Sequence, residues 1–393
     1  MPISFKMEGL PAGFAVGDYG SGRTAKLVVS EFLSSEDGNQ LIKRLEGMST
    51  LLLDSLPEAL RVSPSQIDSL LAIIQPDSTV TLYINELEVR ALISTNVEIK
   101  PGDPVLRSSV TNIARIEFEG VQIPCDCGFF YLFSIDWRKG LFYDISPLQG
   151  EPRRYDLGPV LASMRCYLQY QHIFGASFEE WETLIENSWF PFISLSKATI
   201  EAMFWSARTG EHFDELAEKV AADFDPKLDE RLKTWKQSPH ALGHHEFLDL
   251  VVKHYKNKDF ISASAVLYPR IEGLLRTFHI FQELQSNFSQ DSLTEALVQP
   301  HESTHHDYSL LLPTQFRRFL KEVYFKSFDP RKPKGVSRHT VSHGVAVTGD
   351  MDKKASLLGL LTVDQLFYLM QFNQEPLSAA LAPVKIPKET QKP

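Results

Sequence analysis

Hydrophobic and polar residues alternate in the first part of the chain in short segments of the kind that form β-strands. Five such segments are rich in Val, Ile, Phe and Tyr, and turn signals such as Pro101-Gly102-Asp103-Pro104 separate them. The segments span residues 79–85, 88–94, 112–119, 128–136 and 140–145. Short strands joined by short turns predict an antiparallel or mixed sheet.

Helices are expected on both sides of these strands in the sequence. Ser63-Pro64-Ser65 has the form of a helix start and predicts a helix that ends near Ile74. Residues 157–174 have the apolar spacing of an amphipathic helix. We therefore predict an α+β domain over residues 1–175, with a role that its residues do not indicate.

After residue 176 the pattern changes to helical periodicity alone. The change begins at the capping box Ser177-x-x-Glu180, and a second helix over 196–208 is stopped by Gly210. Pro269 should kink or split its helix. Further helical segments cover 214–223, 226–235, 246–255, 260–284, 314–325, a short turn from Arg338, and 352–372. We predict a helical connector over 176–240, an all-α bundle over 241–384 and a flexible tail over 385–393.

Length and composition agree with two ordinary globular domains. A chain of 393 residues exceeds the ~250–300 residues at which single cores stop growing. No apolar run reaches the ~18–20 residues of a membrane span, and the N-terminus lacks the apolar core of a signal peptide. We expect a cytoplasmic protein without a membrane partner. Three cysteines, an odd number, argue against a disulfide framework.

Charge is distributed unevenly between the two parts of the chain. Residues 241–393 contain 18 Lys and Arg against 16 Asp and Glu, a net charge of +2. The whole chain has 40 against 50, which leaves 22 against 34, a net charge of −12, for residues 1–240. Ten of the 12 histidines lie between His240 and His343. An acidic region repels nucleic acid, whereas the nearly neutral, histidine-rich part can provide basic patches or acid–base chemistry. We therefore expect functional titratable residues after residue 240.

Three short motifs suggest metal chemistry, but each has a simpler structural interpretation. The segment 301–305, His-Glu-Ser-Thr-His, matches a zinc-protease pattern, yet the preceding Pro300 and its polar residues favour a solvated loop. Cys125-Asp126-Cys127 has too few thiolates for a closed zinc site and is interpreted as small buried thiols. His244-His245-Glu246 fits ordinary polar residues near a helix start. We therefore expect neither a metal nor another cofactor.

The segment 338–344, Arg-His-Thr-Val-Ser-His-Gly, is the strongest candidate for catalysis. Ser337 can cap a short helix there, and His339 and His343 lie one turn apart on a shared face. Histidine can move protons near neutral pH, and arginine can bind phosphate charge and stabilise charge that develops in a transition state. Arg338 and His343 are about 140° apart on an ideal helix, so the arginine must reach back or a dimer must combine two pairs.

The spacing between arginine and histidine is not specific by itself. A similar spacing occurs at Arg165 and His172, in the part of the chain that we assign to the α+β domain. The later segment differs in its surroundings, because it follows the basic run Arg331-Lys332-Pro333-Lys334 in the helical region.

Together with residues 268–276, Tyr-Pro-Arg-Ile-Glu-Gly-Leu-Leu-Arg, this segment resembles the HEPN superfamily, most closely the subgroups whose motif ends in His-Gly. The resemblance covers about the last 150 residues. It implies a helical bundle that forms a homodimer and acts as a metal-independent ribonuclease in stress or phage defence. Arg338 and His343 match the invariant pair of the family, His339 stands where the family often has Asn or Asp, and Glu272 matches an acidic residue of the earlier helix.

Two functional hypotheses follow. The first is an endoribonuclease acting on RNA, with Arg338, His339 and His343 as catalytic residues. Its substrate-binding residues would be Arg331, Lys332, Lys334 and Glu272. The alternative is a catalytically inactive HEPN-like module that binds RNA, a nucleotide or a protein partner. Clustering of Arg338, His339 and His343 in an open cleft would favour the enzyme, whereas a buried His343 with satisfied hydrogen bonds would favour the module. A simpler structural interpretation is that Arg338 and His343 only fix the short helix to neighbouring carboxylates or carbonyls.

Overall fold

The computed structural model describes residues 2–7, 15–16, 26–27, 29–56, 58, 62–95, 99–106, 109–282, 288–302 and 308–372. The chain divides into two compact units. The first comprises Met1–Ser94, Asn112–Gly175 and Asp307–Ser309, and the second comprises Thr95–Thr111, Ala176–His306 and Leu310–Pro393. An antiparallel sheet occupies the N-terminal part and helices occupy the C-terminal part, so the predicted α+β class is confirmed.

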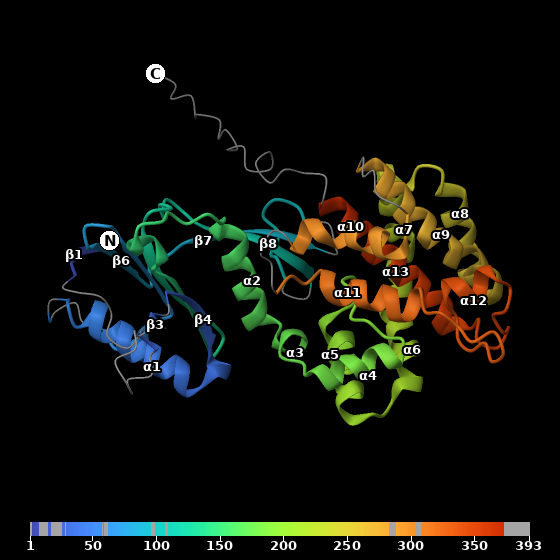
Figure 1. Cartoon of the computed structure of the whole chain (residues 1–393), viewed down its shortest axis with the longest axis horizontal. Coiled ribbons are helices and arrows are strands. Elements are labelled where there is room, and N and C mark those ends of the chain that lie inside the picture. Colours follow the sequence, from blue (N-terminus) through green and yellow to red (C-terminus); the bar gives the residue numbers. More distant parts are fainter. Residues whose placement is uncertain are drawn as a thin grey trace, which may run out of the picture. The chain divides into compact units, whose positions relative to one another are not determined.

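Six strands form the main sheet of the first unit, in the order β1-β6-β5-β9-β10-β4, and all their pairings are antiparallel (Figure 1). They are β1 (Ile3–Lys6), β4 (Ser30–Ser34), β5 (Ser69–Ile74), β6 (Thr79–Ile84), β9 (Gly128–Ile135) and β10 (Arg138–Asp144). Two-stranded sheets are formed by β7 (Val89–Thr95) with β8 (Val110–Phe118), and by β2 (Ala15–Val16) with β3 (Lys26–Leu27).

The central strands of this sheet are buried on both faces. On one face Leu70, Leu132 and Leu141 pair across β5, β9 and β10 and join a core with Met48 of α1 (Asn39–Met48). On the other face α2 (Leu157–Gln169) packs against β9 and β10. A strand covered on both faces has no alternation of apolar and polar residues, which explains the continuous apolar run in β9.

The structure overturns the predicted helix from Ser63 to Ile74. Only a single 3₁₀ turn, Pro64–Gln66, forms there, and β5 follows it between β6 and β9. A short, fully buried apolar run has the same local pattern in a strand and in a helix, so only its neighbours decide between them. The helix predicted over 157–174 is also interrupted, because Tyr170 leaves the helical conformation between α2 and α3 (Gln171–Phe174).

The second unit is helical, and its caps follow the sequence signals. The Ser177 hydroxyl accepts from the backbone N–H of Glu180 at 3.2 Å, and the Glu180 carboxylate accepts from the N–H of Ser177 at 2.9 Å. Gly210 takes the left-handed conformation, with φ of 75°, directly after α5. The helices are α4 (Phe178–Glu186), α5 (Lys197–Thr209), α6 (Phe213–Phe224), α7 (Leu228–Gln237), α8 (His245–Lys256), α9 (Phe260–Phe281), α10 (Gln290–Glu302), α11 (Pro313–Phe319), α12 (Arg338–Ser342) and α13 (Lys353–Phe372).

Helix α9 is the structural centre of this unit. Pro269 does not split it, since α9 runs without a break from Phe260 to Phe281. It packs against α8, α10, α12 and α13, and Gly359 of α13 lies so close to Leu267 that an added Cβ would be 2.5 Å from the leucine side chain. Helix α9 therefore carries its side chains into contact with several other elements at once.

Two features of the helical unit were not predicted. Helix α10 was not foreseen, and the segment predicted over 314–325 is α11 followed by a π-helical turn at Leu320–Tyr324. The predicted tail, 385–393, lies outside the described residues. Among the residues that the structure describes, no helix is both long enough and apolar enough to cross a membrane.

Candidate functional site

Both ends of the short helix α12 are fixed by hydrogen bonds. Ser337 is extended, and its hydroxyl accepts from the Thr340 backbone N–H at 3.2 Å and donates to the Lys326 carbonyl at 3.0 Å. After the helix, Gly344 has φ of 69°, and the backbone N–H of Val345 donates to the Thr340 carbonyl at 3.0 Å. The left-handed conformation of Gly344 suits glycine, so Ser337 and Gly344 both have a local structural role at the ends of α12.

The two histidines of this segment lie side by side. The ring centroids of His339 and His343 are 6.2 Å apart, and the ring planes differ by 18°. His339 is half-buried, whereas His343 is exposed, with the ring of Phe328 centred 5.8 Å away. Residues four apart on a helix share a face, which explains the stacking. One imidazole of this pair is therefore open to solvent.

Arg338 forms an ion pair with Glu272 of α9. The other carboxylate oxygen of Glu272 accepts from Nε and Nη2 of Arg276, at 2.9 and 2.7 Å. The Glu272 side chain is only 8% exposed, while that of Arg338 is 27% exposed. A buried carboxylate shared by two arginines is well compensated, and the three groups together keep one net positive charge.

Gln290, the first residue of α10, holds His339 in one orientation. The amide Nε2 of Gln290 lies 2.8 Å from Nε2 of His339. With the amide donating, the imidazole Nε2 accepts and its proton lies on Nδ1. Burial lowers the pKa of His339, and the positive charges of Arg338 and His343 act in the same direction, so the neutral form is favoured. No motif includes Gln290, and the sequence carried no signal for this contact.

The predicted substrate-binding residues differ in their surroundings. Arg331, Lys332 and Lys334 are exposed in the loop before α12, and none of them forms an ion pair with another described residue. Glu272, in contrast, is buried and occupied by two arginines. The three basic residues are thus available to a phosphate, whereas Glu272 holds Arg276 and Arg338 in place.

The zinc-protease pattern does not form the expected solvated loop at its first residues. His301 and Glu302 are the last two residues of α10, and His301 is buried with Nε2 3.0 Å from the Leu369 carbonyl oxygen. The apolar residues before Pro300 extend the helix this far, which corrects the loop interpretation for His301. His305 lies outside the described residues. Among the described residues no three His, Cys, Asp or Glu side chains are grouped to hold a metal ion.

The prediction of small buried thiols is confirmed for Cys127 and wrong for Cys125. Cys125 is exposed, whereas Cys127 and Cys166 are buried. Cys125 lies in a surface turn, whereas Cys127 directly precedes β9. Burial raises the pKa of Cys127 to about 11 and that of Cys166 to about 12, so neither thiol is ionised near neutral pH.

The remaining histidine motifs do not form catalytic clusters. His244 is buried before α8, with Nε2 3.1 Å from the Thr277 hydroxyl, and has a structural contact of the expected kind. Arg165 and His172 lie on separate helices, α2 and α3, and the His172 ring faces Tyr170 at 6.2 Å. The segment 165–172 contains a single histidine, so it has no counterpart of the ring pair formed by His339 and His343.

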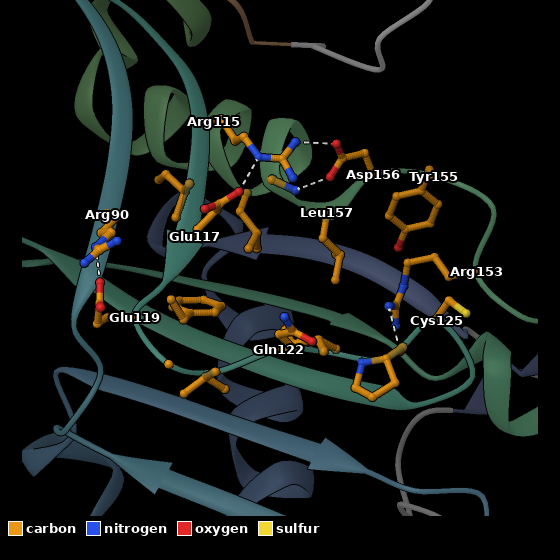
Figure 2. A pocket seen from close by; sticks show the side chains of 18 residues that line it. Arg90, Arg115, Glu117, Glu119, Gln122, Cys125, Arg153, Tyr155, Asp156 and Leu157 are labelled. Atoms are coloured by element: carbon orange, nitrogen blue, oxygen red, sulfur yellow. Dashed lines mark hydrogen bonds and ion pairs between the residues drawn. The ribbon is translucent and has the colours of Figure 1, made fainter. Parts of the chain in front are cut away.

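A concave pocket of about 770 Å³ lies within the first unit (Figure 2). Its walls come from β8, the following segment 120–125 and the start of α2. Figure 2 shows the Arg115 side chain directed toward Asp156 and Glu117. Nε of Arg115 lies 2.7 Å from Glu117, and Nη1 contacts Asp156, which caps α2 by accepting from the Gly158 N–H at 3.0 Å.

The charges of this pocket are balanced. Besides Arg115, its lining includes Arg90, which is paired with Glu119, and Arg153, whose Nε lies 3.1 Å from Asp144. Because each arginine of the lining has a carboxylate partner, the pocket has no excess positive charge for a phosphate chain. The sequence does not predict this pocket, since its residues are distant in the chain and the Arg115–Asp156 ion pair joins β8 to the start of α2.

The segment around α12 therefore offers two adjacent imidazoles, an arginine and exposed basic residues, while the pocket of the first unit is electrostatically neutral. Comparison with known proteins adds no further assignment. No protein-family model, no curated protein and no solved structure matches this chain.

Proposed function

We propose that the chain is a metal-independent endoribonuclease of HEPN type, with its active site at α12. The observation that carries this proposal is the pair of adjacent imidazoles, half-buried His339 and exposed His343, in the same short helix segment as Arg338. Histidine moves protons near neutral pH, and arginine neutralises phosphate charge. A buried His343 was expected to favour the binding module, and His343 is exposed. The resemblance of the segment 338–344 to HEPN motifs supports the same choice.

In the proposed reaction, the ribose 2'-hydroxyl attacks the adjacent phosphorus while His343 takes its proton. The bond from phosphorus to the 5'-oxygen breaks, and an acid returns a proton to that oxygen. The products carry a 2',3'-cyclic phosphate and a 5'-hydroxyl. Arg338 holds the charge that develops on the phosphorane, and His339, fixed by Gln290, donates its Nδ1–H to a phosphate oxygen. Arg331, Lys332 and Lys334 would bind neighbouring phosphates.

We also propose that the active form is a homodimer through the helical unit. Two proton transfers need two groups, and His339 is already engaged by Gln290. A two-fold dimer would add the partner's His343 as the second proton-transfer group, opposite the first. Sedimentation of the full chain at micromolar concentration tests this, and a strict monomer that still cleaves RNA contradicts it.

The direct test incubates the purified full chain with total RNA in the presence of EDTA. Cleavage should persist, and the 3' ends should be cyclic phosphates. His343→Ala and Arg338→Ala should each lower the rate by ~10²–10⁴, the usual cost of losing a positioned acid, base or transition-state cation. Arg165→Ala and His172→Ala are matched controls with similar spacing but no paired rings, and their rates should stay near that of the wild type.

A binding module without catalysis is the second candidate, and the Arg338 ion pair is the observation in its favour. A guanidinium already held by Glu272 can act as a structural tie, while exposed Arg331, Lys332 and Lys334 bind phosphates. On this alternative the wild type binds RNA without cleaving it, and His343→Ala binds equally well. Unchanged cleavage by His343→Ala would also reject the proposed active site.

A further inference from the structure

A large aromatic side chain stands exposed beside the α12 site. Phe288, which precedes α10, is 42% exposed. The guanidinium of Arg276 lies 5.5 Å from its ring centroid, and the His279 ring lies 5.1 Å away. These contacts position the Phe288 ring and leave part of it open to solvent. An exposed aromatic ring beside a cation is a typical surface for stacking an unpaired nucleobase.

Phe288 is connected to the proposed catalytic residues in two ways, along the chain and through ion pairs. Phe288 lies two residues before Gln290, whose amide contacts His339. Arg276, the neighbour of the Phe288 ring, shares the Glu272 carboxylate with Arg338. The Phe288 ring is thus connected to Arg338 through Arg276 and Glu272. A base on Phe288 would therefore belong to a nucleotide close to the phosphate held at Arg338.

We propose that Phe288 is a base-stacking platform that selects an unpaired nucleotide next to the cleaved bond. This inference rests on the proposed ribonuclease function and adds to it a residue that discriminates between substrates. Bases in a duplex are already stacked on one another, so Phe288 can engage only a base that is free to leave its neighbours. The platform should tolerate every base, because each has a flat π face.

Phe178 provides a matched control in the same helical unit. It is 69% exposed, and the guanidinium of Arg318 lies 5.7 Å from its ring centroid. Its environment is thus close to that of Phe288, but among the described contacts it touches none of Arg338, His339 or His343. If any exposed phenylalanine beside an arginine improves RNA binding, the two substitutions will have equal effects.

The test measures single-turnover cleavage of a short RNA strand with one cleavage site by the full chain. Abasic nucleotides are placed at successive positions on both sides of the cleaved bond, and wild type is compared with Phe288→Leu and Phe178→Leu. Phe288→Leu should lower kcat/KM by about 5- to 150-fold, the equivalent of ~1–3 kcal/mol per stacked base. One abasic position should cost the wild type a similar factor and cost Phe288→Leu almost nothing further, whereas Phe178→Leu should respond like the wild type.

Additive losses at every position, or equal losses for Phe288→Leu and Phe178→Leu, would overturn the platform while leaving the ribonuclease proposal intact. Binding of a non-cleavable 2'-O-methyl strand, followed by fluorescence polarisation, keeps the two proposals separate. If wild type cleaves no RNA, the ribonuclease proposal fails. In that case the wild type should still bind the single strand more tightly than its duplex. Loss of this preference in Phe288→Leu but not in Phe178→Leu supports the platform, and equal preferences in all three proteins overturn it.

Discussion

Removal of the Glu272 carboxylate is the sharpest perturbation of the α12 site. This side chain, 8% exposed, accepts two hydrogen bonds from Arg276 and forms the ion pair with Arg338. Glu272→Ala would leave two guanidinium groups without their shared anion. It would also release Arg338 from α9, which is the element that orients it.

The size of the effect can be worked out from the exposure of each partner. Breaking a fully buried ion pair costs ~3–5 kcal/mol, because an uncompensated charge remains. Here Arg276 and Arg338 are 44% and 27% exposed, so water can partly replace the lost carboxylate. We therefore expect the free energy of unfolding to fall by ~1–3 kcal/mol, and cleavage to fall by up to ~10²-fold, because a cation displaced by 1 Å can cost about that much.

A double-mutant cycle tests this reasoning. The free energy of unfolding of the full chain is measured by chemical denaturation for Glu272→Ala, Arg338→Ala, Arg276→Ala and the two double variants. We expect the coupling energy to be larger for Glu272 with Arg338, the less exposed arginine, than for Glu272 with Arg276. A Glu272→Ala protein within ~0.5 kcal/mol of wild type, with no coupling to Arg338, would refute our account of the buried carboxylate.

The other predictions concern local packing, capping and pH. Ser337→Ala should lower the free energy of unfolding by ~1 kcal/mol and reduce RNA cleavage, because it removes the cap that starts α12; denaturation and rate measurements that match wild type would contradict this. Gly140→Ala should cost ~1–3 kcal/mol, since an added Cβ would lie 2.7 Å from a methyl group of Leu168, while Gly349→Ala, with open space around it, should cost far less in the same denaturation assay. Burial lowers the pKa of His244 in the folded chain below its usual value of 6.5, so the unfolded chain binds the proton more readily. The stability that neutral His244 contributes is therefore fully present above pH 6.5 and is lost as the pH falls from 6.5 through the lower pKa of the folded chain. When the pH is lowered from about 7.5 to about 5.5, the free energy of unfolding measured in urea titrations should fall less for His244→Gln than for wild type, by up to ~1 kcal/mol. An equal fall in both proteins would reject the role of this histidine.

Much of the local structure was determined by the sequence alone. The Ser177 capping box, the stop at Gly210 and the short helix after Ser337 all formed as predicted. The five predicted strand segments correspond to β6–β10. The caps and helix ends depend on residues a few positions apart, whose side chains and backbone groups interact locally, and the strand segments have a clear local apolar pattern bounded by turn residues.

Tertiary structure decided the features that depend on distant partners. The apolar run that forms β5 was predicted as part of a helix, because only pairing with β6 and β9 makes it a strand. The α12 site followed the same rule. The sequence placed His339 and His343 on one face, but Gln290 and Phe288 reached the site through the packing of α10 and α12 on α9. Neither residue belongs to a motif, since a hydrogen bond or ring contact between residues far apart in the chain leaves no local pattern in the sequence.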